Sequence, residues 1–182
     1  MIREFSIHAK PSNNKAKIAT VVLLTLSLLN FIAYAIMRYF EVQKSGLAGV
    51  LVIALITSAV FIYTKYVSCE YYYDVTFDYE NTPVFVVRQT SGKRTSTLCH
   101  INLSDILTIK RESVGERREH KTPKGYVRYV YVPTLFPEHT YRLTLYSRYE
   151  KAEIIIECSD GMAMQLLDYS RIAKEEYSSG DE

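Results

Sequence analysis

The chain has 182 residues and a formal net charge of +2, so it is long enough for one or two domains and too nearly neutral for its total charge to indicate a partner. Its three cysteines, Cys69, Cys99 and Cys158, are odd in number and widely spaced. This pattern argues against a disulfide framework and favours a reducing compartment. The pair Cys99-His100 points to opposite faces of a strand and has no second half-site, so we expect no metal and no cofactor.

Two long apolar runs follow a short N-terminal segment. The first, Ile18 to Met37, has twenty residues. At about 1.5 Å per residue it covers the roughly 30 Å hydrocarbon core of a bilayer. The second, Leu47 to Tyr63, is shorter, but a snorkelling Lys65 and the following Tyr66 extend it. The sequence therefore predicts two transmembrane spans, over about 18–40 and 46–66, that form a hairpin.

The charges flanking the two runs predict how the hairpin is oriented. The connection EVQKS is short, so the helices are antiparallel and both chain termini lie on one side. Five basic residues flank that side against two on the other; they are Arg3, Lys10, Lys15, Lys17 and Lys65 against Arg38 and Lys44. The positive-inside rule then predicts cytoplasmic termini in the inner (plasma) membrane. In the alternative interpretation, the first run is a signal peptide that is cleaved at Ala33-Tyr34-Ala35.

A few small and polar residues inside the runs are candidates for packing. Asn30 and Thr57 lie at similar depths from the centre of the connection, so a hydrogen bond between the helices would satisfy the amide. Ala54 and Ser58 form a small-xxx-small face for close approach of the first helix or of a second copy. A transport role for Asn30 is the alternative, but two helices enclose no pathway and no ionisable residue lies mid-membrane.

From Val67 the apolar pattern changes to a period of two, which predicts strands. In YYYDVTFDY the residues Tyr71, Tyr73, Val75, Phe77 and Tyr79 share one face. Six further strands are predicted, separated by turns rich in Pro and Gly, over 84–89, 95–103, 106–112, 126–132, 141–146 and 152–158. A final amphipathic helix begins at Ser159 or Asp160.

These elements predict an α+β membrane protein: a two-helix hairpin, then seven antiparallel strands in a sandwich or barrel that the C-terminal helix closes. The predicted organisation is an N-terminal cytoplasmic segment over 1–17, the hairpin over 18–66, one domain over 67–177 and a flexible tail over 178–182. No Gly/Ser linker separates the hairpin from the domain, so the domain is expected to lie close to the bilayer.

Three segments together carry a resemblance to a known family. They are YDVTFDYENTPVFVVRQ, the segment INLSDILTIKR with its Leu103-x-x-Ile106-x-x-Ile109 spacing, and the helix after Cys158. The chain from Tyr71 to about Tyr177 resembles a bacterial PH-like domain, and the preceding hairpin is similar to that of membrane proteins of anaerobic bacteria. The resemblance implies the fold and a membrane-associated, non-enzymatic role. The first connection, YENTPV, contains no Lys or Arg, unlike eukaryotic PH domains that grip phosphoinositides there.

No pattern of catalytic residues accompanies this resemblance. The four histidines are scattered, and the sequence contains no GxSxG, P-loop, GxGxxG or HExxH motif. We therefore expect a protein that is not an enzyme.

The stretch from Lys110 to Arg128 holds seven basic and three acidic residues. Its candidates for contact with an anionic surface are Arg111, Arg117, Arg118, Lys121, Lys124 and Arg128. Each basic residue near anionic headgroups contributes about 1 kcal/mol, so several would orient a tethered domain. The alternative is a solvated loop, because Glu112, Glu116 and Glu119 dilute the charge. Nucleic acid is not expected, since the stretch is short and lacks a recognition helix.

The stretch VPTLFPEH is the second candidate for binding. Leu135 and Phe136 lie between two prolines, which stop strand pairing and stiffen the connection. These side chains either contact a partner or the headgroup region, or else plug one end of the sandwich. Together the features predict a membrane-anchored interaction module, a scaffold or regulatory subunit with an unknown protein partner. The alternatives are an anionic-lipid sensor acting through residues 110–128, and a structural membrane protein that oligomerises.

Overall fold

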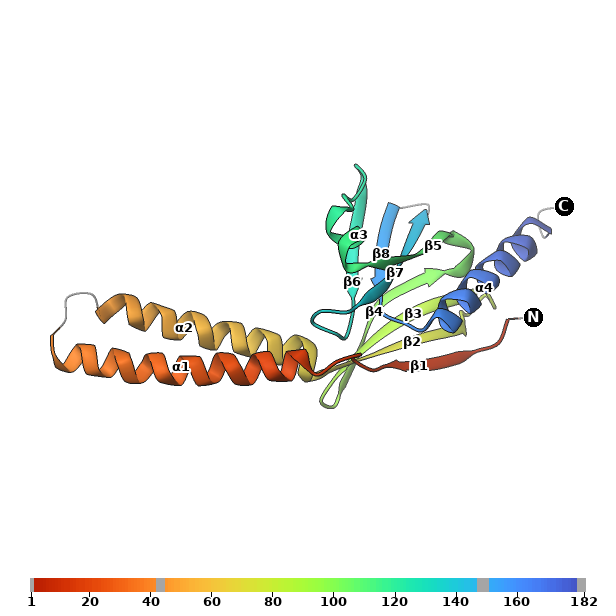
Figure 1. The fold of residues 1–182 in the computed structure, drawn as a ribbon. Helices are drawn as coiled ribbons and strands as arrows, with labels where there is room; N and C mark the ends of the chain where they lie inside the picture. Colours follow the sequence, from red (N-terminus) through yellow and green to blue (C-terminus); the bar gives the residue numbers. More distant parts are fainter. Residues whose placement is uncertain (1, 42–44, 147–150, 180–182) are drawn as a thin grey trace. The chain divides into compact units, whose positions relative to one another are not determined.

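The structure, a computed structural model, describes residues 2–41, 45–146 and 151–179 (Figure 1). The chain divides into two compact units. The first, which we call the helical unit, is Asn13–Cys69. The second, which we call the β unit, combines the segment up to Ser12 with the chain from Glu70 onwards. The class is α+β, with two apolar helices followed by sheets and a C-terminal helix, as the sequence predicts.

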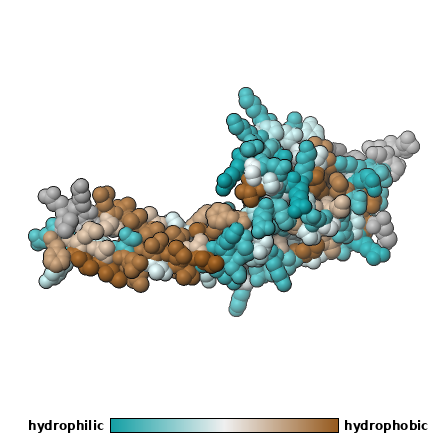
Figure 2. Space-filling view, in the orientation of Figure 1, coloured by the Kyte–Doolittle hydropathy of each residue, from teal (hydrophilic) through white to brown (hydrophobic). Residues whose placement is uncertain are grey.

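The helical unit consists of α1 (Lys15–Tyr39) and α2 (Ser45–Ile62), which continues as a π-helical turn, η1 (Tyr63–Val67). Both helices are long and apolar enough to cross a membrane, with mean hydropathies of 2.1 and 2.3. Figure 2 shows apolar side chains covering much of their visible surface. Most of these side chains are exposed in the isolated chain, as expected for helices that face lipid. Part of the predicted connection, residues 42–44, lies outside the described residues.

The two helices pack along a seam whose buried residues are four or seven positions apart. On α1 the seam contains the buried Ala16, Thr20 and Ser27, and on α2 the buried Val52 and Ala59. Small residues let the two backbones approach closely. Gly49 illustrates this, because a Cβ placed there would lie 3.4 Å from the ring of Tyr34 on the other helix.

The predicted hydrogen bond between Asn30 and Thr57 is not formed. Asn30 Nδ2 donates to Leu26 O at 2.9 Å and Thr57 Oγ1 donates to Ile53 O at 2.9 Å, so each polar group is satisfied within its own helix. Ser58 likewise donates to Ala54 O. Thr57, Ala54 and Ser58 are all exposed, whereas Asn30 is half-buried. The predicted small-residue face therefore does not pack on α1, and the seam uses the other side of α2.

The first sheet of the β unit has the strand order β1-β2-β3-β4. Its strands are β1 (Phe5–Ala9), β2 (Cys69–Phe77), β3 (Pro83–Ser91) and β4 (Arg94–Asn102). β3 and β4 form a hairpin closed by Gly92 and Lys93; Gly92 has a φ of +59°, which a residue with a side chain rarely adopts. β1 pairs antiparallel with β2, with Ile7 opposite Tyr73.

The second sheet has the order β5-β7-β8-β6. Its strands are β5 (Ile106–Ser113), β6 (Tyr126–Tyr131), β7 (His139–Tyr146) and β8 (Lys151–Ile156). A 3-10 turn, η2 (Leu103–Asp105), joins β4 to β5, and a short helix, α3 (Val114–Glu119), follows β5. β6 and β8 are parallel, and the other assigned strand pairs of this sheet are antiparallel.

Two features correct the predicted seven-stranded antiparallel domain. The β unit has eight described strands with one parallel pair, and the additional strand, β1, comes from the segment expected to precede the membrane helices as a separate piece. FSIHA alternates Phe5, Ile7 and Ala9 with polar residues, which is a strand pattern. The seven strands that the sequence predicts are all present. Of the predicted tail over 178–182, residues 180–182 lie outside the described part, and the residues before them end the last helix.

The core lies between the two sheets. Its largest fully buried side chains include Tyr73 and Phe85 from the first sheet and Leu143, Ile154 and Ile156 from the second. The C-terminal helix α4 (Asp160–Ser179) packs on η2 and β5, with Leu166 fully buried. The ring of Phe5 on β1 lies 6.3 Å from that of Tyr169 on α4, between ring centroids. The helix therefore closes one end of the core, as predicted.

Candidate functional site

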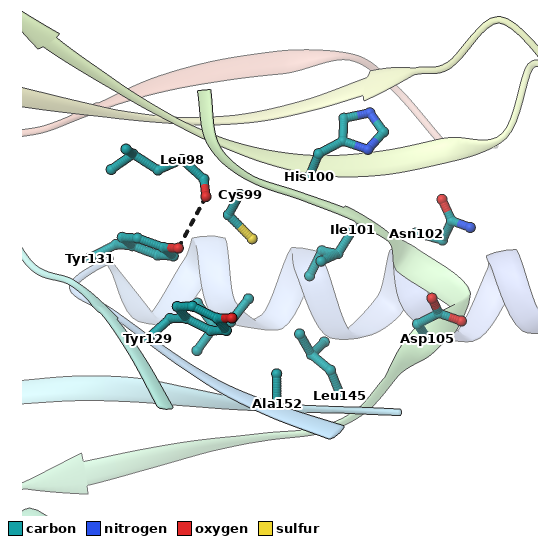
Figure 3. A pocket seen from close by; sticks show the side chains of 11 residues that line it. Leu98, Cys99, His100, Ile101, Asn102, Asp105, Tyr129, Tyr131, Leu145 and Ala152 are labelled. Atoms are coloured by element: carbon teal, nitrogen blue, oxygen red, sulfur yellow. Dashed lines mark hydrogen bonds between the residues drawn. The ribbon is translucent and has the colours of Figure 1, made fainter. Parts of the chain in front are cut away.

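A groove of about 400 Å³ lies between the sheets, on the side where β4 and β6 are the last strands of their sheets. One wall is formed by β4, with Cys99 and Ile101 (Figure 3). These two alternate along the strand with His100, which also lines the groove but projects its side chain to the other side of the strand (Figure 3). Alternation of this kind follows from the period of two along a strand. The alternation of residues along β4 therefore determines which of its side chains face the groove.

The opposite wall comes from the inner face of the second sheet. Tyr129 and Tyr131 on β6 have nearly parallel rings, 6.2 Å apart between centroids with an interplanar angle of 9°. Leu145, Ala152 and Ile154 extend the wall across β7 and β8 (Figure 3). The surface is thus apolar and aromatic, the composition usual in sites that bind organic ligands or peptides.

The two walls are bridged at one point. Tyr131 Oη donates a hydrogen bond to Leu98 O at 3.1 Å, from β6 to β4 (Figure 3). Asn102 and Asp105, near the turn that joins the sheets, add polar groups to the lining. A segment that enters the groove would therefore meet an apolar centre with a carboxylate on its border.

The thiol in the groove is not activated. Burial raises the pKa of Cys99 to about 12, so the thiolate is scarce near neutral pH. Burial raises the pKa of Cys158 to about 12 in the same way. Among the described residues no group of three His, Cys, Asp or Glu side chains is placed to hold a metal ion.

The predicted basic residues of 110–128 divide into two groups. Two make contacts within the fold: Arg111 pairs with Asp160 at 3.2 Å, and Arg117 donates to Pro137 O at 3.2 Å. A third, Arg128, is half-buried, and its Nε is shielded from solvent. The other three, Arg118, Lys121 and Lys124, are exposed. Charge counting groups all six, whereas the structure leaves half of them available to a partner.

The same stretch contains a helix that the sequence interpretation missed. Ser113 accepts a hydrogen bond from Glu116 N, and Glu116 Oε2 accepts one from Ser113 N at 2.7 Å, which is a capping box at the start of α3. The signal Ser113-x-x-Glu116 was present in the sequence. Hydrogen bonding to Ser113 lowers the pKa of Glu116, as expected for an N-terminal carboxylate.

A row of charged side chains crosses the outer face of the second sheet, and we call it the charge row. It consists of Glu112 on β5, Arg142 on β7, Glu153 on β8 and Arg128 on β6. Arg142 lies 3.0 Å from Glu112 and 3.5 Å from Glu153. His120, after α3, contacts Glu153 at 2.9 Å between Nε2 and Oε1. The two glutamates are almost fully buried, at 3% and 2% exposure. Although they lie on the outer face of the sheet, they are therefore shielded from solvent.

The predicted pair Leu135 and Phe136 is split by the fold. Leu135 is half-buried, whereas Phe136 is 61% exposed. Their neighbour Thr134 is buried and accepts a hydrogen bond from Ser12 N at 2.8 Å while donating to Glu157 Oε1. The connection is thus anchored at its base, and only Phe136 is presented at the surface.

A second hollow of the β unit lies on the outer face of the first sheet. Glu4, just before β1, and Ser6 of β1 line it together with Asp74 and Arg88. Arg88 Nε donates to Asp74 Oδ2 at 2.5 Å. Asp74 and Arg88 are therefore already paired, and Glu4 accepts a hydrogen bond from Thr76 Oγ1, so the groove between β4 and β6 is the better candidate site. Comparison of the chain with protein-family models, with curated proteins and with solved structures gives no match.

Proposed function

We propose that this protein is a non-enzymatic, membrane-anchored interaction module whose β unit binds an extended segment of a partner protein. The observation that carries the proposal is the groove between two edge strands, β4 and β6, which combines an aromatic and aliphatic wall with polar groups. An extended chain satisfies its backbone groups on a strand edge and places alternate side chains in a groove. The tyrosine wall suits apolar or aromatic side chains of such a segment.

The membrane anchor is part of the same proposal. Two apolar helices, each with the length of a span, support a hairpin that crosses the bilayer twice. The pairing of β1 with β2 supports an even number of crossings, because strands that precede and follow the helices must lie on one side to pair. The excess of flanking Lys and Arg supports the cytoplasmic side of the inner membrane. The sheets and closing helix are also compatible with the PH-like resemblance, which stays part of the proposal.

A second candidate is contact with anionic lipid through the segment after β5. Its support is the exposure of Arg118, Lys121 and Lys124. Three exposed charges near headgroups contribute about 3 kcal/mol together, enough to orient a tethered domain but not to select one lipid. The engagement of Arg111 and Arg117 within the fold makes this the weaker candidate.

The groove is tested with the full-length protein in lipid nanodiscs, panned against a library of random octapeptides displayed on phage. Two substitutions are compared. Ile101→Trp fills the groove, and Val130→Trp places the same bulk at an exposed residue of β6 that does not line it. We expect enriched peptides with alternating apolar residues, whose affinity falls at least about tenfold with Ile101→Trp and stays unchanged with Val130→Trp.

Equal weakening by both variants, or enrichment of peptides that bind irrespective of Ile101→Trp, would contradict the groove as the binding site.

For the second candidate, the nanodiscs are made with neutral or anionic lipid, and the triple variant Arg118→Ser, Lys121→Ser and Lys124→Ser is compared with the native chain. Protection of residues 114–125 from hydrogen exchange in anionic discs alone, lost in the triple variant and at high salt, would favour lipid.

A further inference from the structure

We propose that residues 114–125, which we call the cover, form a pH-dependent latch that His120 closes onto the charge row in mildly acidic conditions. The cover starts with α3, which packs on β5, and continues to Gly125 before β6. His120 joins it to the row, with Nε2 at 2.9 Å from Glu153 Oε1. A second contact runs from Arg117 Nη2 to Pro137 O at 3.2 Å.

His120 contacts the row through Glu153, and the row itself spans all four strands of the sheet. Two of its members are carboxylates, Glu112 on β5 and Glu153 on β8, and two are guanidiniums, Arg142 on β7 and Arg128 on β6. The row is therefore balanced without the imidazole. Histidine is the side chain whose charge changes between about pH 5 and 8. His120 thus determines whether the site carries no net charge or one positive charge.

The nearest neighbour sets the direction of the effect. Glu153 is 2% exposed and shares its Oε1 between His120 and Arg142, the latter at 3.5 Å. The imidazole is closest to a carboxylate, and a hydrogen bond becomes stronger when both partners are charged. Protonation therefore tightens the cover, and loss of the proton loosens it. The side chain of His120 is 22% exposed, so protons reach it.

The closed cover is also poised to open. Five of the six buried side-chain polar atoms without a hydrogen-bond partner among the described residues gather in this one place; they are Glu112 Oε2, Arg128 Nε, Thr140 Oγ1, Arg142 Nη1 and Glu153 Oε2. Buried polar atoms without partners disfavour the state that buries them. Opening would release Glu153 Oε1 from His120, and it would also move the exposed Arg118, Lys121 and Lys124.

The test is hydrogen–deuterium exchange of the full-length protein in detergent micelles at about pH 5.5 and about pH 7.5, with rates corrected for intrinsic exchange. We expect peptides within 114–125 to be protected at least about threefold more at the lower pH. His120→Gln, which keeps a hydrogen-bonding side chain without the titration, should abolish that ratio. His100→Gln, an exposed histidine on β4, should retain it.

Protection of α4 serves as the internal reference for folding. If His120→Gln lowers protection there too, Glu153→Gln replaces it as the test variant, since it removes the charge that the imidazole faces and should also abolish the pH ratio. The latch would be overturned if the native protein showed equal protection at the two pH values, or greater protection at the higher one. It would also be overturned if the ratio of the two protections were unchanged in the variant that stays folded.

Discussion

Tyr73 on β2 donates a hydrogen bond from its hydroxyl to Tyr131 O on β6 at 2.6 Å, and so connects the two sheets through the core. The same hydroxyl accepts a hydrogen bond from Glu157 N at 3.3 Å. The Tyr73 side chain is fully buried. One phenol thereby satisfies two backbone groups that lie far from it in the sequence.

Tyr73→Phe should destabilise the β unit by about 1–3 kcal/mol, because it removes the hydroxyl that hydrogen-bonds a partly buried carbonyl and a partly buried N–H. Tyr72→Phe is the matched control, since the neighbouring hydroxyl donates to Glu70 at the surface, and it should cost less than about 1 kcal/mol. Urea unfolding in micelles, followed by near-ultraviolet circular dichroism, measures both. Equal effects would mean that the buried phenol does not tie the sheets.

Arg142 on β7 is the bridge of the charge row, and Arg142→Met should cost about 3–5 kcal/mol because two buried carboxylates lose their partner. Changing Glu112 and Glu153 to Leu in the same chain should recover most of that loss, since the three ion-paired members of the row are then replaced together by apolar residues, and such a replacement is tolerated. Arg171→Met, on an exposed pair of α4, should change stability by less than about 0.5 kcal/mol. If the triple variant is no more stable than Arg142→Met alone, the charges are not coupled as described.

Asp160 begins α4 and accepts a hydrogen bond from Tyr141 Oη at 2.6 Å, which lowers the pKa of its carboxyl; nearby Arg111 acts in the same direction. A lowered folded pKa stabilises the protein above the ordinary range near pH 4, and that contribution disappears as pH falls through the lowered value. The difference in urea midpoint between the native chain and Tyr141→Phe should therefore be largest near neutral pH and shrink below about pH 4. Tyr79→Phe, a fully exposed tyrosine, should show no such dependence. A difference that stays constant down to about pH 2 would rule out the carboxylate as its source.

Cys99 and Cys158 have thiols whose pKa burial raises to about 12. Alkylation at about pH 8 should be at least about 100-fold slower in the folded protein than in urea, because the thiolate is the reactive form. Burial of the neutral thiols contributes stability below the ordinary pKa near 8.5, and it is lost as pH rises towards 12. Mass spectrometry of timed iodoacetamide reactions measures each site separately. Rapid labelling of Cys99 in the folded state would show that the groove exposes more of β4 than described.

The long helices α1, α2 and α4 and seven of the strands could be predicted from the sequence because each follows from a local period, whereas the short α3 was missed. Apolar runs of the length of a bilayer predict α1 and α2, and alternation around Tyr71, Tyr73 and Val75 predicts β2, whose three side chains are indeed buried. Turn residues such as Gly92 mark the strand ends. β1 was missed because it is only five residues long and its partner follows the helices.

The sites were less predictable because they depend on register. Glu112, Arg142 and Glu153 come from three strands, and only the pairing of β5 with β7 and β7 with β8 aligns them. The groove likewise needs β4 and β6 at the free edges of two sheets, which no local pattern specifies. Composition alone also does not reveal which arginines of 110–128 are engaged within the fold.

The position of β1 also bears on the order of events during synthesis. Residues 10–70 separate Ala9 from its strand partner Tyr71, and closing a flexible loop of that length would cost on the order of 4 kcal/mol in chain entropy. Pairing of α1 with α2 and η1 brings the two ends of that segment together first, since α1 contacts η1. The hairpin then holds the two ends of the segment near each other, so that β1 can pair with β2. A defect in helix packing, for example at Gly49 against Tyr34, would accordingly delay the folding of a sheet to which neither residue belongs.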